Sequence, residues 1–98
     1  MNITQSAING KTVLAPEGRL DTVSAPELEK VVKDVIPTTD ELVLDLAKLD
    51  YISSAGLRIL LSAQKAMMTK GGMTVCNVNE TILEIFEVTG FSDILTIV

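Results

Sequence analysis

Residues 45–58 read DLAKLDYISSAGLR and join a short apolar run to a long helical pattern. The run itself, LVLDL at residues 42–46, is typical of a strand buried in the middle of a sheet. Over residues 54–70 the apolar side chains recur at helical spacing, and two glycines end the pattern. Ser53 and Ser54 therefore lie where a strand gives way to a helix.

Two roles are open to a serine at this junction. The start of a helix carries unpaired backbone N–H groups and a partial positive charge. A serine hydroxyl there can cap the helix, which is worth about 1 kcal/mol. It can instead carry a phosphate, because a helix N-terminus accommodates an anion. The first role makes the junction a structural element, and the second makes it a regulatory switch.

Strands and helices alternate along the rest of the chain. Asn9-Gly10 indicates a hairpin between residues 1–8 and 12–15, after which Arg19-Leu20-Asp21 is expected to lead out of the sheet. A helix is predicted from Ser24, which forms a capping-box pattern with Glu27, up to Pro37. The remaining predictions are a strand at 73–76, a helix at 79–89, a helical turn at 91–95 capped by Ser92, and a closing strand at 96–98. The pattern predicts an α/β fold with a parallel or mixed sheet.

Composition narrows the class of protein. The 98 residues, 47% of them hydrophobic, predict a single domain spanning 1–98 with its own core. A net charge of −5 with only 8 Lys and Arg argues against nucleic-acid binding and against an anionic membrane surface. No run is long and apolar enough to suggest membrane insertion. The single cysteine, Cys76, lies in an apolar run and is interpreted as a small buried side chain in a cytoplasmic protein.

The sequence offers little for catalysis, and we expect neither an enzyme nor a cofactor. It contains no histidine, so neither serine has an imidazole to activate it, and histidine metal sites are excluded. Asp21, Asp45 and Asp50 lie at or near the ends of strands, where carboxylates that come together can bind a divalent metal or form a glycosidase-like pair. Solvated or capping carboxylates are the preferred interpretation, with no metal.

The predicted helix at 54–70 carries more apolar surface than one core-facing stripe needs. Its apolar side chains cover roughly 200° of the helix circumference, about twice the usual width. Packing against a neighbouring helix is the first explanation, and an exposed edge that binds a partner is the second. The residues of this arc are Leu57, Ile59, Leu60, Leu61, Ala63, Met67 and Met68.

Three segments resemble the STAS-domain family, and most closely its stand-alone bacterial anti-sigma factor antagonists. The strongest is LVLDL followed by LDYISSAGL, over residues 42–57. GRLD at 18–21, with Ala25 after it, resembles the segment that precedes the first helix of the family, and FEVTGF at 86–91 resembles its late helix and turn. The resemblance covers nearly the whole chain. It implies a mixed sheet of four to five strands, with about four helices packed mainly on one face.

The resemblance also implies a function. In such antagonists an anti-sigma factor that is a serine kinase phosphorylates a serine at the helix start, and a phosphatase restores it. The unphosphorylated antagonist binds the kinase, and a sigma factor is released. Aligning Gly56-Leu57 with the common motif Asp-Ser-Ser/Thr-Gly-Leu places the acceptor at Ser54, with Ser53 less favoured. The implied partner-binding residues are Asp21, Asp45, Ser53, Ala55, Gly56, Arg58, Ile59 and Ser62.

This chain departs from the motif at two positions. Ser53 stands where the motif has an acid, and Ala55 stands where it has a hydroxyl. A second interpretation therefore keeps the fold without the switch, as a STAS subunit of a larger assembly such as a lipid-transport ATPase complex. A third, an acyl carrier protein, has the size, the acidity and a serine at a helix start, but requires an all-helical fold. The oligomeric state stays open.

Overall fold

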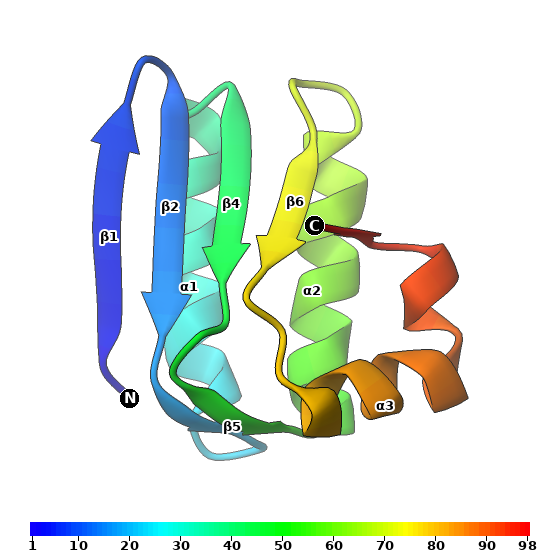
Figure 1. The fold of residues 1–98 in the computed structure, drawn as a ribbon. Helices are drawn as coiled ribbons and strands as arrows, with labels where there is room; N and C mark the ends of the chain where they lie inside the picture. The colour runs from blue at the N-terminus through cyan, green and yellow to red at the C-terminus, as the bar shows by residue number, and fades with distance from the viewer.

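The computed structural model describes residues 1–98 as an alternation of strands and helices (Figure 1). The strands are β1 (Ile3–Ile8), β2 (Lys11–Pro16), β3 (Gly18–Leu20), β4 (Glu41–Asp45), β5 (Leu49–Ile52), β6 (Met73–Cys76) and β7 (Thr96–Ile97). The α-helices are α1 (Ala25–Val35), α2 (Ser54–Met67) and α3 (Glu80–Thr89). Two single 3₁₀ turns, η1 (Ile36–Thr38) and η2 (Phe91–Asp93), complete the chain.

Five strands form the main sheet in the order β1-β2-β4-β6-β7. β1 runs antiparallel to β2, and every other neighbouring pair is parallel. The β1–β2 turn places Asn9 at φ 52° and Gly10 at φ 81°, as a two-residue hairpin turn with two positive φ angles requires. The predicted mixed sheet is confirmed, with five strands.

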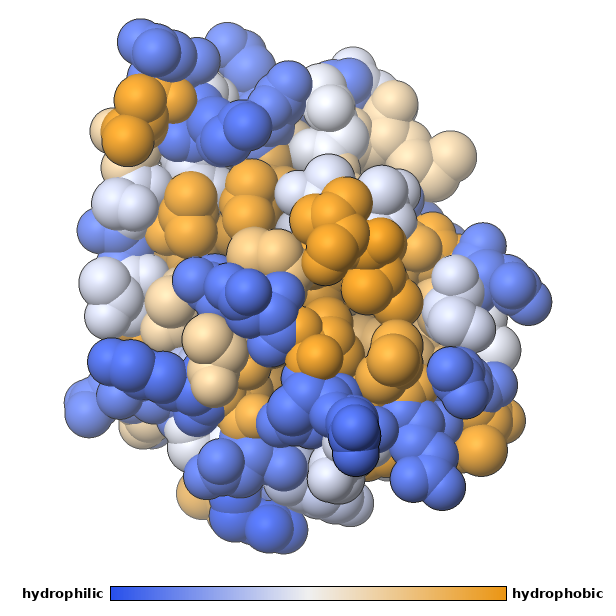
Figure 2. Space-filling model, viewed as in Figure 1, coloured by the Kyte–Doolittle hydropathy of each residue, from blue (hydrophilic) through white to orange (hydrophobic).

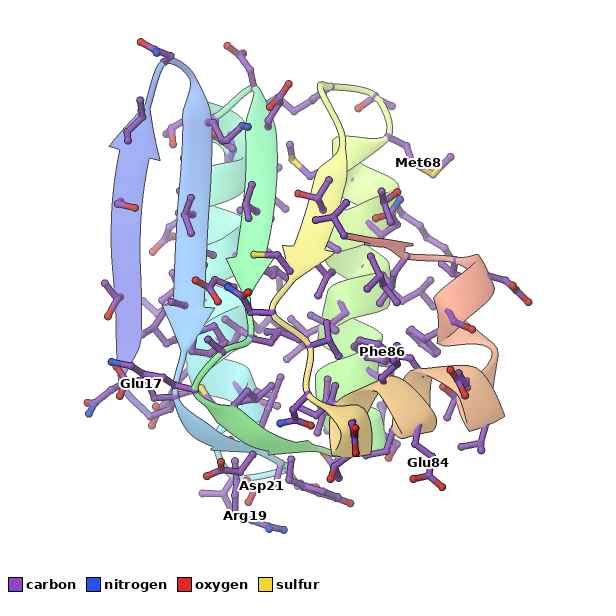
Figure 3. The ribbon with its side chains drawn as sticks, viewed as in Figure 1. Glu17, Arg19, Asp21, Met68, Glu84 and Phe86 are labelled. Carbon is purple, nitrogen blue, oxygen red and sulfur yellow. The ribbon has the colours of Figure 1, made fainter.

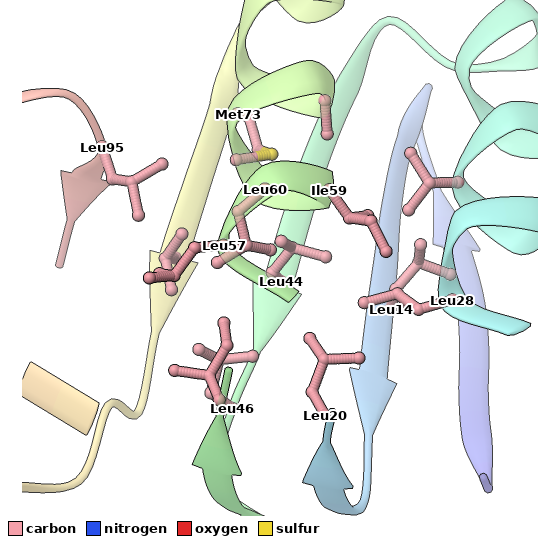
Figure 4. Packing of buried hydrophobic residues seen from close by; sticks show 14 of the residues in the cluster. Leu14, Leu20, Leu28, Leu44, Leu46, Leu57, Ile59, Leu60, Met73 and Leu95 are labelled. Atoms are coloured by element: carbon pink, nitrogen blue, oxygen red, sulfur yellow. The ribbon is translucent and has the colours of Figure 1, made fainter. Parts of the chain in front are cut away.

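The core lies between this sheet and the helices α1 and α2, which cover one of its faces (Figure 1). Alternate strand residues such as Leu14 and Leu44 point toward the helices, because side chains of a strand alternate between its two faces. They meet Leu28 from α1 and Ile59 and Leu60 from α2 (Figure 4). Twenty-one buried apolar residues form one cluster.

The opposite face of the sheet is not covered by any helix. Val13, Val43 and Cys76 lie on it and are half-buried. Figure 2 views this face and shows apolar side chains gathered toward its middle among polar ones. None of the helices has the length and apolar content that a bilayer crossing demands.

β3 and β5 form a second, two-stranded parallel sheet below the carboxyl ends of the main strands. We expected residues 19–21 only to lead out of the sheet, and residues 49–52 to belong to the connection before the helix. Both segments are too short to give a strand signal of their own. The structure shows what they contribute: Leu20, Leu49 and Ile52 are fully buried beneath the start of α2.

The expected number of helices, about four, is wrong: there are three α-helices. The predicted turn at 91–95 is one 3₁₀ turn without a side-chain cap from Ser92. Gly90 ends α3 at φ 81°, and the buried Leu95 leads directly into β7, so the segment has room for a single turn only. α2 ends at Met67 rather than at Lys70, because the N–H of Gly72 folds back to donate to the Met67 carbonyl at 3.1 Å.

Candidate functional site

Ser53 connects β5 to α2 and caps the helix. Its backbone is extended, and its N–H donates to the Leu20 carbonyl of β3 at 2.8 Å. The N–H of Gly56 donates to the Ser53 hydroxyl oxygen at 3.5 Å, and the N–H of Leu57 donates to the Ser53 carbonyl at 2.9 Å. Ser53 therefore holds the helix start on the β3–β5 pair, with a long side-chain cap.

Ser54 is the first residue of α2, and its side chain is exposed. The structure gives its hydroxyl no hydrogen-bond partner. The two roles that the sequence left open thus fall on two different serines. Ser53 takes the capping role, and the Ser54 hydroxyl is free at a helix N-terminus.

Gly56 allows the first turn of α2 to lie directly on the small sheet. A Cβ atom at this position would be 2.7 Å from Leu20 Cγ and 2.8 Å from Ile52 Cγ1, inside van der Waals contact. Both neighbours are fully buried and have no room to retreat. The motif glycine is therefore required by close packing and not by an unusual φ angle.

Asp21 organises the loop between β3 and α1, beside the junction. Its Oδ1 accepts hydrogen bonds from the N–H groups of Val23 and Ser24 at 3.0 and 3.1 Å. The hydrogen bond from the Ser24 N–H is the main reason that the pKa of Asp21 lies below its ordinary value of 3.8. This carboxylate is thus held in its charged form at the edge of the site.

The predicted capping box at the start of α1 is wrong. Ser24 precedes the helix but makes no capping bond to it. Its hydroxyl donates to the Arg19 carbonyl at 2.6 Å and accepts from the Asp21 N–H at 2.9 Å, so it is used by the loop. Glu27 binds the N-terminal ammonium of Met1 instead of reaching back to Ser24.

A cation that the sequence did not reveal lies next to Asp21. The Arg19 guanidinium is 4.5 Å from the centre of the Tyr51 ring, and Arg19 Nε is 4.0 Å from Asp21 Oδ2 (Figure 3). Arg19 and Tyr51 are register partners in the β3–β5 pair. Their contact follows from that pairing, which gave no signal in the sequence.

A shallow groove of about 180 Å³ runs between the N-terminal turns of α1 and α2. It brings together three of the predicted partner-binding residues, Ala55, Arg58 and Ile59. Ser62 is exposed one turn further along α2. The other residues that line the groove are Thr22, Ala25, Pro26 and Glu29.

Asp45 lies apart from this groove. It ends β4 and accepts hydrogen bonds from the Ala47 N–H and the Asn77 side-chain amide, both at 3.0 Å. It lines a different hollow, together with Thr4, Ala15, Glu17, Ala47 and Lys48. The structure gives Asp45 no hydrogen bond to Asp21 or to either serine. No three His, Cys, Asp or Glu side chains are grouped so as to hold a metal ion.

The wide apolar arc of α2 is mostly packed. Leu57, Ile59, Leu60, Ala63 and Met67 are buried, and Leu61 is half-buried. Met68, just beyond the helix, is 70% exposed and points away from the body of the molecule (Figure 3). Burial against the sheet and the neighbouring helices thus accounts for most of the excess, and one methionine remains at the edge.

Comparison with known proteins gives close matches in sequence. The family model described as "STAS domain" matches residues 2–98. The chain is 34% identical over 99 residues to the "Putative anti-sigma factor antagonist BtrV" of Bordetella bronchiseptica, covering 99% of this chain and 85% of that protein. It is 28% identical over 81 residues to the "Anti-sigma-B factor antagonist" of Bacillus subtilis, covering 82% and 74%.

Solved structures share the fold. A crystal structure of an anti-sigma factor antagonist from Mycobacterium paratuberculosis superposes with a TM-score of 0.90 at 24% identity, covering 98% of this chain and 83% of that one. The unphosphorylated form of the anti-sigma factor antagonist SpoIIAA superposes with a TM-score of 0.83 at 14% identity, covering 99% and 88%. The family model and the Bordetella relative together show that this chain belongs to the STAS domain family.

Proposed function

We propose that this protein is an anti-sigma factor antagonist that works as a phosphorylation-controlled partner switch. In its unphosphorylated form it binds an anti-sigma factor that is also a serine kinase, and a sigma factor is released. The kinase phosphorylates Ser54, and a serine phosphatase restores it. The names of the Bordetella and Bacillus relatives support the antagonist role. The proposal goes beyond those names where it specifies a kinase, a phosphatase and Ser54 as the modified residue.

The observation that carries the proposal is the division of roles between Ser53 and Ser54. Because Ser53 caps α2, the hydroxyl of Ser54 is exposed and makes no hydrogen bond that a phosphate would break. A phosphate adds a charge of about −1.5 to −2 at neutral pH. The unpaired N–H groups and the positive end of the helix dipole offset part of that charge. Phosphorylation of Ser54 is therefore compatible with an unchanged fold.

The effect of the phosphate would fall on a bound partner. Ser54 directly precedes Ala55, which lines the groove between α1 and α2, and Arg58 is one turn further along. A partner lying over this groove and the helix end would meet a doubly charged group where it had met a small hydroxyl. The loss of two to three kcal/mol at an interface weakens binding about 100-fold.

The departures from the family motif leave this chemistry intact. Aspartate and serine are both good N-caps, because each offers a side-chain oxygen to the free N–H groups of the first turn. Ser53 accepts from Gly56 N–H in this way and so fills the structural role of the missing acid. Ala55 is half-buried against the groove and contributes shape there in place of a hydroxyl.

The test uses the purified protein and a kinase-type anti-sigma factor from the same organism. Incubation of the pair with ATP should add the mass of one phosphate to the wild-type protein and to Ser53→Ala, but not to Ser54→Ala. Ser54→Asp should bind the kinase about 100-fold more weakly than wild type, and Ser54→Ala should bind in the presence and absence of ATP. A phosphate on Ser53 alone, or no phosphate on either serine, would refute the switch at Ser54.

The alternative is a STAS subunit of a larger assembly, such as a lipid-transport ATPase complex, that never switches. The motif hydroxyl that is missing at Ala55 is the observation that favours it, since a junction that departs from the phosphorylated motif suits a subunit that is never switched. Affinity capture from the native cells distinguishes the two: ATPase subunits support the alternative, and an anti-sigma factor kinase supports the switch.

A further inference from the structure

β1 forms a free edge of the main sheet. It is the first strand in the order β1-β2-β4-β6-β7 and pairs only with β2. Within residues 1–98 no helix or strand lies beyond it (Figure 1). An edge strand presents a row of unpaired N–H and C=O groups, which is a template for pairing with another strand.

The hairpin register identifies which backbone groups are free. Ile8 and Lys11 flank the two-residue turn and therefore form a hydrogen-bonded pair. Hydrogen-bonded pairs recur at every second residue, and at the far end the Glu17 N–H donates to the Asn2 carbonyl at 2.9 Å, which agrees with this phase. The even-numbered residues of β1 thus bond to β2. The odd-numbered ones, Ile3, Gln5 and Ala7, direct their N–H and C=O groups outward.

This edge lacks the usual protection against pairing. Natural edge strands are blunted by lysines, prolines or bulges. Residues 1–10 contain no charged side chain and no proline, although the chain as a whole carries 8 Lys and Arg and 13 Asp and Glu. The β1–β2 register is also regular from Ile3 to Ile8, without a bulge.

We propose that β1 pairs antiparallel with β1 of a second copy of this chain, with Gln5 on the twofold axis. The outward-facing residues must then face one another, which sets Gln5 opposite Gln5 and Ile3 opposite Ala7. Three such pairs exchange about six hydrogen bonds, whereas a shift of two residues in either direction leaves about four. In this register every outward group of Ile3, Gln5 and Ala7 meets an identical strand that has no charged side chain, proline or bulge to oppose the pairing.

The charge distribution agrees with this pairing. Two copies that each carry a net charge of −5 repel one another over most of their surfaces, and the uncharged β1 edge avoids a close like-charge contact. A single pair of short strands is a small interface, so the dimer should be weak and should depend on concentration. No residue of the Ser53–Ser54 junction lies in β1, so this inference stands independently of the proposed function.

Amide exchange and sedimentation test the register and the stoichiometry together. As the concentration rises from about 10 µM to about 1 mM, the sedimentation coefficient should shift from monomer toward dimer. Over the same range the amides of Ile3, Gln5 and Ala7 should become at least about tenfold more protected. The amides of Thr4, Ser6 and Ile8 should be protected at both concentrations, because β2 already holds them.

Substitutions at Gln5 place like or opposite charges across the axis. Gln5→Lys alone should weaken the dimer at least about tenfold, and mixing it with Gln5→Glu should restore association as a heterodimer. Gln5→Pro should also abolish the dimer, since it removes an outward N–H without breaking a bond to β2. Ala66→Lys, on the exposed side of α2, is the matched control and should dimerise like wild type. Unfolding at low concentration checks that each variant folds.

Several results would overturn the proposal. One is a monomer at every concentration, and another is a dimer that Gln5→Lys and Gln5→Pro leave unchanged. Protection of Ile3, Gln5 and Ala7 that appears only when a different protein is added would assign the edge to that protein instead of a second copy.

Discussion

The two ends of the parallel strands use their polar groups in different ways. At the amino ends of β2 and β4, the buried Thr12 hydroxyl donates to the buried Thr39 hydroxyl oxygen at 2.8 Å. The Thr39 hydroxyl in turn lies 2.9 Å from the Gly10 carbonyl and 2.8 Å from the Glu41 carbonyl. At the carboxyl ends, by contrast, the Ser54 hydroxyl is exposed and unpaired.

This difference separates residues that maintain the fold from residues that are available for binding. The Thr12 and Thr39 hydroxyls at the amino ends are buried and satisfied within the chain, so their removal should reduce stability and affect little else. At the carboxyl ends the packing is equally tight beneath the surface, at Gly56, but the surface itself carries free polar groups. We therefore expect two classes of substitution at the carboxyl ends. Those at buried positions should change stability strongly, and those at exposed positions should change binding alone.

The largest expected effect tests the packing beneath the junction. Gly56→Val should lower the free energy of unfolding by about 3 kcal/mol or more, because its side chain must enter space occupied by Leu20 and Ile52. Urea denaturation followed by circular dichroism measures the loss. Ala66→Val, an exposed substitution in the same helix, should cost less than about 1 kcal/mol, the difference in helix propensity. Equal losses for the two variants would show that α2 does not rest on the β3–β5 pair.

The next effect tests the buried hydroxyl pair at the amino ends of β2 and β4. Thr39→Val keeps the shape of a fully buried side chain but removes the hydroxyl that Thr12 and two carbonyl groups share. Leaving such groups buried and unsatisfied should lower the free energy of unfolding by about 2 kcal/mol. The double variant Thr12→Val with Thr39→Val should lose less than the sum of the single losses, since it removes both partners together. Additive losses would mean that the two hydroxyls act independently.

The sequence predicted the strands and helices well where a short stretch of residues determines them. It predicted them poorly where contacts between distant segments determine them. The Asn9-Gly10 hairpin, the strand at 42–46 and the helix predicted at 54–70 were found, the helix with its end three residues too late, because turn residues and apolar periodicity act over a few positions. β3 and β5 were missed because neither is a strand except when paired with the other. The same pairing creates the Arg19–Tyr51 contact, which no pattern could have shown.

At the junction, the sequence narrowed the choice to two serines without separating their roles. The resemblance to the family motif, aligned on Gly56-Leu57, favoured Ser54 as acceptor, and that assignment stays a prediction. Only the backbone geometry assigns the cap to Ser53, since a one-residue shift of the helix start would reverse the roles. Ser24 was predicted to cap a helix and does not. Its hydroxyl is used by the loop at Asp21 instead.

A smaller effect separates the two serines. Ser53→Ala should lower the free energy of unfolding by about 0.5 to 1 kcal/mol, at the low end for an N-cap because its bond to Gly56 is long. Ser54→Ala should change stability by less than about 0.5 kcal/mol, since the hydroxyl makes no bond. Thermal unfolding of both variants, measured side by side, is the test. A larger loss for Ser54→Ala than for Ser53→Ala would reverse the assignment of roles at the junction.

The smallest effect concerns acid stability and the loop beside the junction. The pKa of Asp21 is lowered by the N–H of Ser24 above all, so the folded state favours the charged carboxylate. Its contribution to stability is therefore present above pH 3.8, the ordinary value, and is lost as the pH falls through the lower folded pKa. The difference in unfolding free energy between wild type and Asp21→Asn should be measurable at pH 6 and should shrink toward pH 3.

The control distinguishes this loop from charge in general. Asp50→Asn removes the same charge from the same end of the molecule, but the exposed Asp50 carboxylate makes no hydrogen bond or ion pair in the structure. If Asp50→Asn reproduced the full pH dependence of Asp21→Asn, the net charge of the chain would be responsible and the Asp21 loop would not be specially held. If only Asp21→Asn shows this pH dependence, the carboxyl ends of the strands combine one fixed carboxylate, Asp21, with one free hydroxyl, Ser54. Under the proposed switch, a partner that docks there would meet a fixed anion at Asp21 and, at Ser54, a charge that changes with phosphorylation, so only the second would need to change for binding to change.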